Sequence, residues 1–190
     1  MARSLHSSLL YAWAQTLLFF GRNTLALQAF RDVVRDDPGR CEAWSVLGFL
    51  YADKGELSEA IPAFERALEL QPGDAALCFN AAFTLQRAGG HERAIALFLQ
   101  AIALDRSLDR AWYGLGLSLA HLGRTEEAIP RFKEAARLQP FNPYAGYHLA
   151  AALYKLGRFD EVIAEYERVK DFDPKISLQM RKEFGITGPG

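Results

Sequence analysis

The sequence predicts an all-α protein, an α-solenoid of five stacked helix pairs, because the same residue types recur every 34 positions. Alanine or valine recurs at this interval from Ala26 to Val162, and phenylalanine or tyrosine recurs from Phe30 to Tyr166. Glycines and prolines follow the same interval or twice that interval, at Gly21, Gly55, Gly89, Gly123 and Gly157 and at Pro38, Pro72, Pro140 and Pro174. Such self-similarity is typical of repeat architectures. One structural unit is therefore copied five times.

The repeats predict the organisation of the whole chain. We expect a single domain over residues 7–176, made of repeats 7–40, 41–74, 75–108, 109–142 and 143–176. After Pro174, an apolar face that includes Met180 and Phe184 predicts a capping helix from Ser177 to Phe184. The remainder of the segment 177–190 is expected to be a frayed tail.

Each repeat has the pattern of two helices joined by a tight turn. In repeat 41–74, apolar or small residues at three- and four-residue spacing form one stripe in each helix. These residues are Trp44, Leu47, Gly48 and Tyr51 in the first helix and Ala60, Ile61, Phe64, Ala67 and Leu68 in the second. Gly55 is expected to end the first helix in a left-handed conformation. Pro72 closes the unit because proline cannot continue a helix.

Small residues share one position of the first helix in four repeats. They are Gly48, Ala82, Gly116 and Ala150. A larger side chain at this position would hold the paired helices apart, at a cost of about 1 to 3 kcal/mol. A helix pair of this size cannot bury its apolar face alone, so neighbouring pairs must stack.

Composition excludes several classes of function. The 22 Lys and Arg nearly balance 23 Asp and Glu, so we expect no nucleic-acid partner. The apolar run from Leu9 to Phe20 is too short to span a bilayer and lies in phase with the repeats, so we expect no membrane insertion and a cytoplasmic location. Two cysteines are too few for a disulfide framework.

Motifs for catalysis, cofactors and metals are incomplete in this sequence. The pair His91-Glu92 begins a zincin-like string, but Ile95 stands where the second histidine ligand is needed. Gly114 and Gly116 resemble the start of a dinucleotide loop, but Leu119 stands where the third glycine belongs. We therefore predict no enzymatic activity, no cofactor and no metal site.

The repeat motif resembles the tetratricopeptide repeat. Trp-x-x-Leu-Gly-x-x-Tyr runs from Trp44 to Tyr51, and most of the same pattern follows Trp112. The resemblance covers residues 7–176, with Cys78 and Gly146 standing where the tryptophan would be. It implies a right-handed superhelix whose first helices line the concave side, and a protein-interaction scaffold as the function.

The resemblance also implies which side chains line the concave groove, where we expect a peptide or helix of a partner protein to bind. They are Phe49, Phe79, Asn80, Phe83, Arg87, Arg110, Tyr113, Tyr147 and His148. Asn80 with Arg110 forms the polar pair best suited to a carboxylate or a peptide backbone. The alternative for Phe79 and Phe83 is that they only pack between neighbouring helices.

A second hypothesis assigns the function to the N-terminal helix. Leu9, Trp13 and Phe20 form an apolar stripe that no preceding repeat covers. Exposed apolar patches often mark an interface, which predicts a self-associating subunit such as a homodimer. Alternatively, residues 1–6 fold over part of the stripe. The identity of any partner is not encoded in these patterns.

Overall fold

The structure is a computed structural model that describes residues 2–186, so the predicted frayed end at 188–190 lies outside the described residues. The described residues form eleven helices and no strand, which confirms the all-α class. They divide into two compact units, residues 1–90 and 91–190, each described below by itself.

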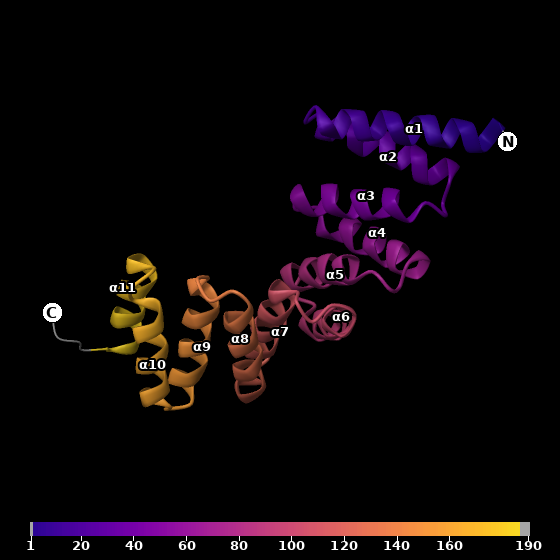
Figure 1. Cartoon of the computed structure of the whole chain (residues 1–190). Coiled ribbons are helices and arrows are strands. Elements are labelled where there is room, and N and C mark those ends of the chain that lie inside the picture. The colour runs from indigo at the N-terminus through magenta and orange to yellow at the C-terminus, as the bar shows by residue number, and fades with distance from the viewer. Residues whose placement is uncertain (1, 187–190) are drawn as a thin grey trace. The chain divides into compact units, whose positions relative to one another are not determined.

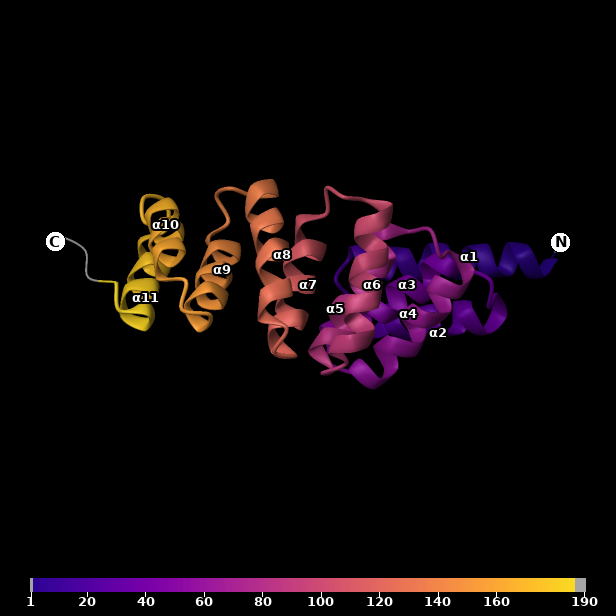
Figure 2. The same ribbon diagram turned by 90° about the horizontal axis from the view of Figure 1, so that it is seen from below.

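Within each unit, consecutive helices pack against one another as pairs joined by short turns (Figures 1 and 2). The first unit contains α1 (Ala2–Phe19), α2 (Asn23–Asp36), α3 (Cys41–Asp53), α4 (Leu57–Leu70) and α5 (Ala75–Arg87). The second contains α6 (His91–Leu104), α7 (Asp109–His121), α8 (Thr125–Leu138), α9 (Pro143–Lys155), α10 (Phe159–Val169) and α11 (Pro174–Phe184).

The recurring glycines end the first helices, as the sequence predicts. All five have positive φ angles, from 67° to 82°. At the end of α3, the Glu56 N–H donates to the Tyr51 carbonyl at 2.9 Å and the Gly55 N–H to the Ala52 carbonyl at 3.1 Å. This pair of hydrogen bonds is the Schellman motif, which satisfies carbonyls that the helix end leaves without a partner. The turn therefore needs glycine for its backbone conformation.

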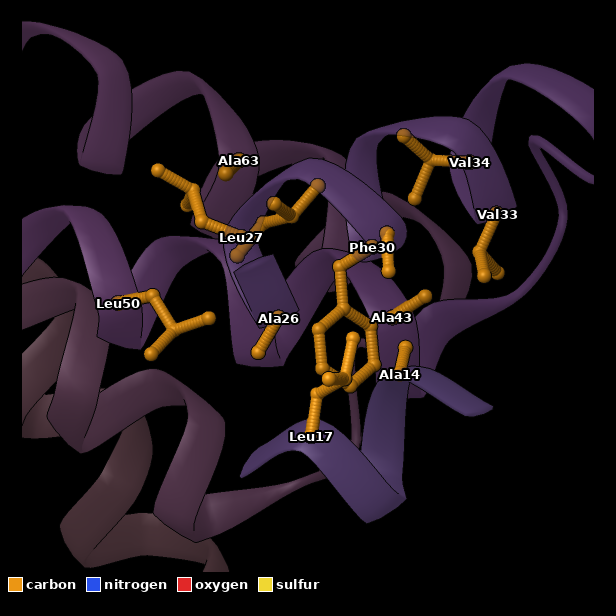
Figure 3. Packing of buried hydrophobic residues seen from close by; sticks show 12 residues of the cluster. Ala14, Leu17, Ala26, Leu27, Phe30, Val33, Val34, Ala43, Leu50 and Ala63 are labelled. Atoms are coloured by element: carbon orange, nitrogen blue, oxygen red, sulfur yellow. The ribbon is translucent and has the colours of Figure 1, made fainter. Parts of the chain in front are cut away.

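A phenylalanine of the second helix forms the centre of the core in four repeats. Phe30, Phe64, Phe98 and Phe132 are at most 2% exposed. Figure 3 shows the cluster around Phe30, where Ala14 and Leu17 of α1 join Ala26 of α2 and Ala43 of α3. Stacking of helix pairs thus buries apolar surface that no single pair could bury.

The small residues of the first helices lie against these rings. A Cβ atom added to Gly48 would lie 2.8 Å from the ring of Phe64, and one added to Gly116 would lie 2.6 Å from the ring of Phe132. Both distances are shorter than van der Waals contact. Glycine at this position lets the backbone of the first helix lie directly on the ring.

The last proline of the series has a different position from the others. Pro38, Pro72 and Pro140 each precede the next helix by three residues, whereas Pro174 is the first residue of α11. The preceding Asp173 accepts a hydrogen bond from the Ile176 N–H at 2.8 Å, and this capping fixes the start of the helix. The helix predicted to begin at Ser177 therefore begins three residues earlier.

Arg168 takes the place of a missing tryptophan in the last repeat. The indole N–H groups of Trp44 and Trp112 donate to the carbonyls of Pro38 and Arg106, both at 3.0 Å. In the last repeat Gly146 occupies the tryptophan position, and the carbonyl equivalent to these two belongs to Pro140. There the Arg168 guanidinium of α10 donates to this carbonyl at 3.1 Å.

The replacement of the tryptophan by Gly146 and Arg168 predicts that the effects of changing these two residues on the free energy of unfolding are coupled. A Cβ atom at position 146 would collide with the Arg168 guanidinium and with a methyl group of Val169. We expect Gly146→Trp to destabilise the protein by about 1 to 3 kcal/mol through overpacking. Adding Arg168→Ala removes the closer of these contacts and frees the Pro140 carbonyl for the indole N–H, so the double variant should recover about 1 kcal/mol. Urea unfolding of the single and double variants gives the coupling energy, and strictly additive losses would contradict the assignment.

Candidate functional site

The predicted groove residues all lie on first helices, divided between the two units. Phe49 lies on α3, and Phe79, Asn80, Phe83 and Arg87 lie on α5 in the first unit. Arg110 and Tyr113 lie on α7, and Tyr147 and His148 lie on α9 in the second unit. Because the pair Asn80 and Arg110 is split between the units, its joint action stays a prediction.

The three phenylalanines of the first unit differ in exposure. Phe49 is 56% exposed and Phe83 is 42% exposed, but Phe79 is only 6% exposed. The rings of Phe79 and Phe83 stack with their centroids 6.1 Å apart. Phe79 is therefore a packing residue, buried against Phe83. The alternative of packing between helices fits Phe79 better than a contact with a partner.

Arg87 and Asn80 have different surroundings on α5. The Arg87 guanidinium donates to the Ala52 carbonyl of α3 at 2.9 Å and lies 5.9 Å from the centroid of the Phe83 ring. Ala52 is near the C-terminus of α3, where the helix dipole favours a positive charge. Arg87 therefore ties the ends of α3 and α5 together beside Phe83. Asn80 is half-buried, and its backbone carbonyl accepts a hydrogen bond from the Thr84 hydroxyl at 2.8 Å.

In the second unit, an aromatic cluster brings Tyr113 and His148 together. Their ring centroids are 5.7 Å apart, and His148 also stacks on the buried ring of Phe132 at 5.8 Å. Burial, with a smaller effect of Tyr144, raises the pKa of Tyr113 to about 12. Burial also lowers the pKa of His148. At neutral pH both groups are therefore uncharged hydrogen-bonding side chains.

Tyr147 connects this cluster to the last helix. Its hydroxyl donates to the Glu183 carboxylate and accepts from the Gln179 side chain at 3.2 Å. The hydrogen bond to Glu183 is the main cause of the raised pKa of Tyr147, and the same bond lowers the pKa of Glu183. Sequence reasoning missed Gln179 and Glu183, although their four-residue spacing places them on one face of α11.

The N-terminal stripe is exposed in the first unit. Leu9 is 68%, Trp13 is 58% and Phe20 is 70% exposed. Residues 2–6 continue α1 as helix, so they do not fold back over the stripe. The expectation of an N-terminal lid is therefore wrong.

The cysteines have the environment of structural thiols. Cys41 and Cys78 are both free. Burial, followed by the charges of Glu42 and Asp74, raises the pKa of Cys41. The Cys41 thiol donates a hydrogen bond to the Ala67 carbonyl at 3.4 Å. Within residues 2–186, no three side chains of the kinds that bind metals are grouped together.

Two segments of the chain, residues 11–75 and 79–143, match a family model described as tetratricopeptide repeat, and residues 119–181 match a second model with the same description. The first model alone matches more than half of the chain. The chain belongs to the tetratricopeptide-repeat family. Tetratricopeptide repeats act as protein-interaction scaffolds and are generally non-enzymatic. The comparison with curated proteins found no match to this sequence.

Solved tetratricopeptide structures share this fold. A crystal structure of MamA has a TM-score of 0.83 and 20% identity, covering 97% of this chain and 98% of MamA. YrrB, described as a TPR protein with an unusual peptide-binding site, has a TM-score of 0.82 and 20% identity, covering 91% of this chain and 90% of YrrB. PilF of Pseudomonas aeruginosa has a TM-score of 0.76 and 19% identity, covering 97% of this chain and 87% of PilF. At these identities the likeness concerns the fold.

None of the helices within residues 2–186 is long and apolar enough to cross a membrane.

Burial of His148 predicts a pH dependence of stability. Its folded pKa lies below the ordinary value of 6.5, so the unfolded chain binds the proton more readily. Stability from this residue is fully present above pH 6.5 and is lost as the pH falls below it, by at most about 1.4 kcal/mol per pH unit. His148→Gln should flatten this part of the curve in urea unfolding between pH 7.5 and 5.5. Exposed His6→Gln is the control, and a His148→Gln curve parallel to the wild type would contradict the prediction.

Proposed function

We propose that this tetratricopeptide domain binds a peptide or helical segment of a partner protein along the exposed face of its first helices. The observation that carries the proposal is the exposure of Phe49 and Phe83, which are 56% and 42% exposed. They occupy the equivalent ninth positions of α3 and α5, two helices that contact each other. Two large apolar rings at one level of adjacent helices offer a surface for an apolar side chain of the partner.

The energy available from these rings is sufficient for a specific interaction. An aromatic side chain buries about 150 to 250 Å² when covered completely, so the exposed parts of both rings amount to roughly 200 Å². At about 25 cal/mol per Å², covering them contributes roughly 5 kcal/mol before the entropic costs of association. Arg87 holds α3 and α5 together beside these rings and so reduces the cost of ordering them.

In the second unit, α7 and α9 offer polar groups of their own to a partner. Tyr144 is 55% exposed on α9, and the uncharged Tyr113 and His148 lie near it. Uncharged donors and acceptors suit the peptide groups of a partner, since they pair with N–H and C=O without the desolvation cost of a full charge. In this proposal Asn80 in the first unit and Arg110 in the second each bind a main-chain or carboxylate group of the partner.

The proposal predicts that partner capture depends on the exposed rings. Phe49→Ala with Phe83→Ala should remove the captured partner from a host lysate and weaken binding of the purified partner at least tenfold by calorimetry. Phe49 is 56% and Phe83 is 42% exposed, so the melting temperature should change by only a few degrees. Leu99→Ala on α6, which is 46% exposed, is the control and should capture normally. A double variant that captures the same partner as the wild type would overturn the proposal.

Self-association through α1 is the second candidate function. It is favoured by the stripe of Leu9, Trp13 and Phe20, in which each side chain is more than half exposed. The sequence from Ser7 to Gly21 contains no charged residue. Depletion of charge around exposed aromatic residues is the composition found at the centre of interfaces. A second copy of the same helix offers a matching apolar surface.

Self-association predicts a change of mass when the stripe is made polar. Trp13→Glu should convert a dimer to a monomer in sedimentation experiments because the carboxylate would be buried without a partner. Leu25→Glu on α2, at a residue that is 58% exposed and outside the stripe, should leave the dimer intact. A wild-type protein that remains monomeric at high concentration removes this candidate.

A further inference from the structure

A pocket in the first unit lies away from the proposed groove residues. Its volume is about 510 Å³, and residues of α2, α3 and α4 line it. None of the predicted groove residues and none of the N-terminal stripe contributes to this lining. The volume is within the range of about 300 to 1,000 Å³ that is typical of ligand pockets. This pocket is large enough for one or two side chains of a bound peptide.

The floor of the pocket is apolar. The buried Val34, Leu47 and Ala63 line it together with the half-buried rings of Trp44 and Tyr51. The Trp44 indole N–H is already used by the Pro38 carbonyl, so the ring offers its apolar surface to the pocket. A bulky aliphatic or aromatic side chain suits such a floor.

The rim of the pocket is basic. Arg31, Arg35 and Arg66 line it together with a single acidic residue, Glu59. Among the described residues Arg31 makes no ion pair. An arginine in this position can bind a carboxylate with two parallel hydrogen bonds.

The other two arginines remain available to a ligand. Arg35 pairs with Asp32 at 2.9 Å, and Arg66 pairs with Glu69 at 2.6 Å. All four side chains are at least 39% exposed. Exposed pairs of this kind contribute little to stability, so a carboxylate of a ligand can compete for either guanidinium.

Two repeats further along the chain, the equivalent position is closed. Arg131 stands where the first unit has Ala63, and its guanidinium lies 5.8 Å from the centroid of the Trp112 ring. The equivalents of Arg31, Arg35 and Arg66 are Leu99, Ala103 and Glu134. Both the open floor and the basic rim therefore distinguish the repeat that contains Trp44.

We propose that this pocket is a second binding site, which accepts an acidic peptide segment carrying one bulky apolar side chain. The apolar side chain lies against Trp44 in the space that Ala63 leaves open, and the acidic residues on either side pair with Arg31 and Arg66. The site is independent of the groove, so the chain can bind two segments at the same time, and simultaneous binding of two segments of one partner would raise the overall affinity.

The experiment uses the indole N–H signals of Trp13, Trp44 and Trp112 in the ¹⁵N-labelled full chain. The probe is the peptide acetyl-Asp-Glu-Ala-Phe-Glu-Asp-amide, in which phenylalanine is the one bulky apolar residue. We expect the Trp44 signal to shift in a saturable way while the Trp13 and Trp112 signals stay in place. A peptide with lysine at the four acidic positions should produce no shift. An unchanged Trp44 signal up to millimolar peptide, or an equal shift with the lysine peptide, would overturn the proposal.

Variants test the floor and the rim separately. Ala63→Arg reproduces the arrangement at Trp112 and should abolish the Trp44 shift. Arg31→Gln with Arg66→Gln changes only exposed residues, should keep the fold, and should weaken binding at least tenfold.

Arg131→Ala uncovers Trp112 without supplying a basic rim, so the acidic peptide should leave the Trp112 signal unchanged. Full binding by the double arginine variant, or a Trp112 shift in Arg131→Ala, would refute the role of the arginines.

Discussion

The contact between a phenylalanine of the second helix and a small residue of the first helix is the constraint on which the rest of the structure depends. Phe64 lies against Gly48, and Phe132 lies against Gly116, with no space for even a methyl group between them. Packing this close fixes the separation and rotation of the paired helices. Once the rotation is fixed, the remaining side chains of each helix have determined directions. Some enter the core, and the others are left for solvent or for a partner.

The same constraint explains why both proposed binding surfaces lie where they do. The stripe of α3 that contains Gly48 is used by the core, so the ninth residue, Phe49, points away from it and is exposed. On the second helix α4, Ala63 lines the same pocket as Trp44 of the first helix α3. Ala63 precedes Phe64, and its small size leaves the Trp44 ring accessible. Ala63 is itself buried in the core cluster, so a larger side chain at this position would change both the pocket and the packing around it.

Sequence periodicity predicted the parts of the fold that each repeat must have. The turn glycines, the buried phenylalanines and the small residues opposite them were found at the expected positions because backbone geometry and close packing leave few alternatives. The periodicity of proline did not predict the start of α11. A proline fits both the turn before a helix and the first helical position, and Asp173 decides between them by capping. Phe79 was expected in the groove, and its burial depends on the tertiary packing around α5, which a one-helix pattern does not contain.

Contacts between elements far apart in the sequence were the least predictable. Arg168 replaces an indole hydrogen bond from a different helix, and Tyr147 pairs with Glu183 of α11, 36 residues later. Neither contact follows a repeat interval. The Arg168 contact compensates for a departure from the repeat pattern, and the Tyr147 contact joins the last repeat to the helix that caps it. Residues that maintain the repeat are equivalent in every copy, so they cannot distinguish one partner from another. Specificity must come from positions that differ between copies, such as Ala63 and Arg131, because only there does the surface of one repeat differ from the next.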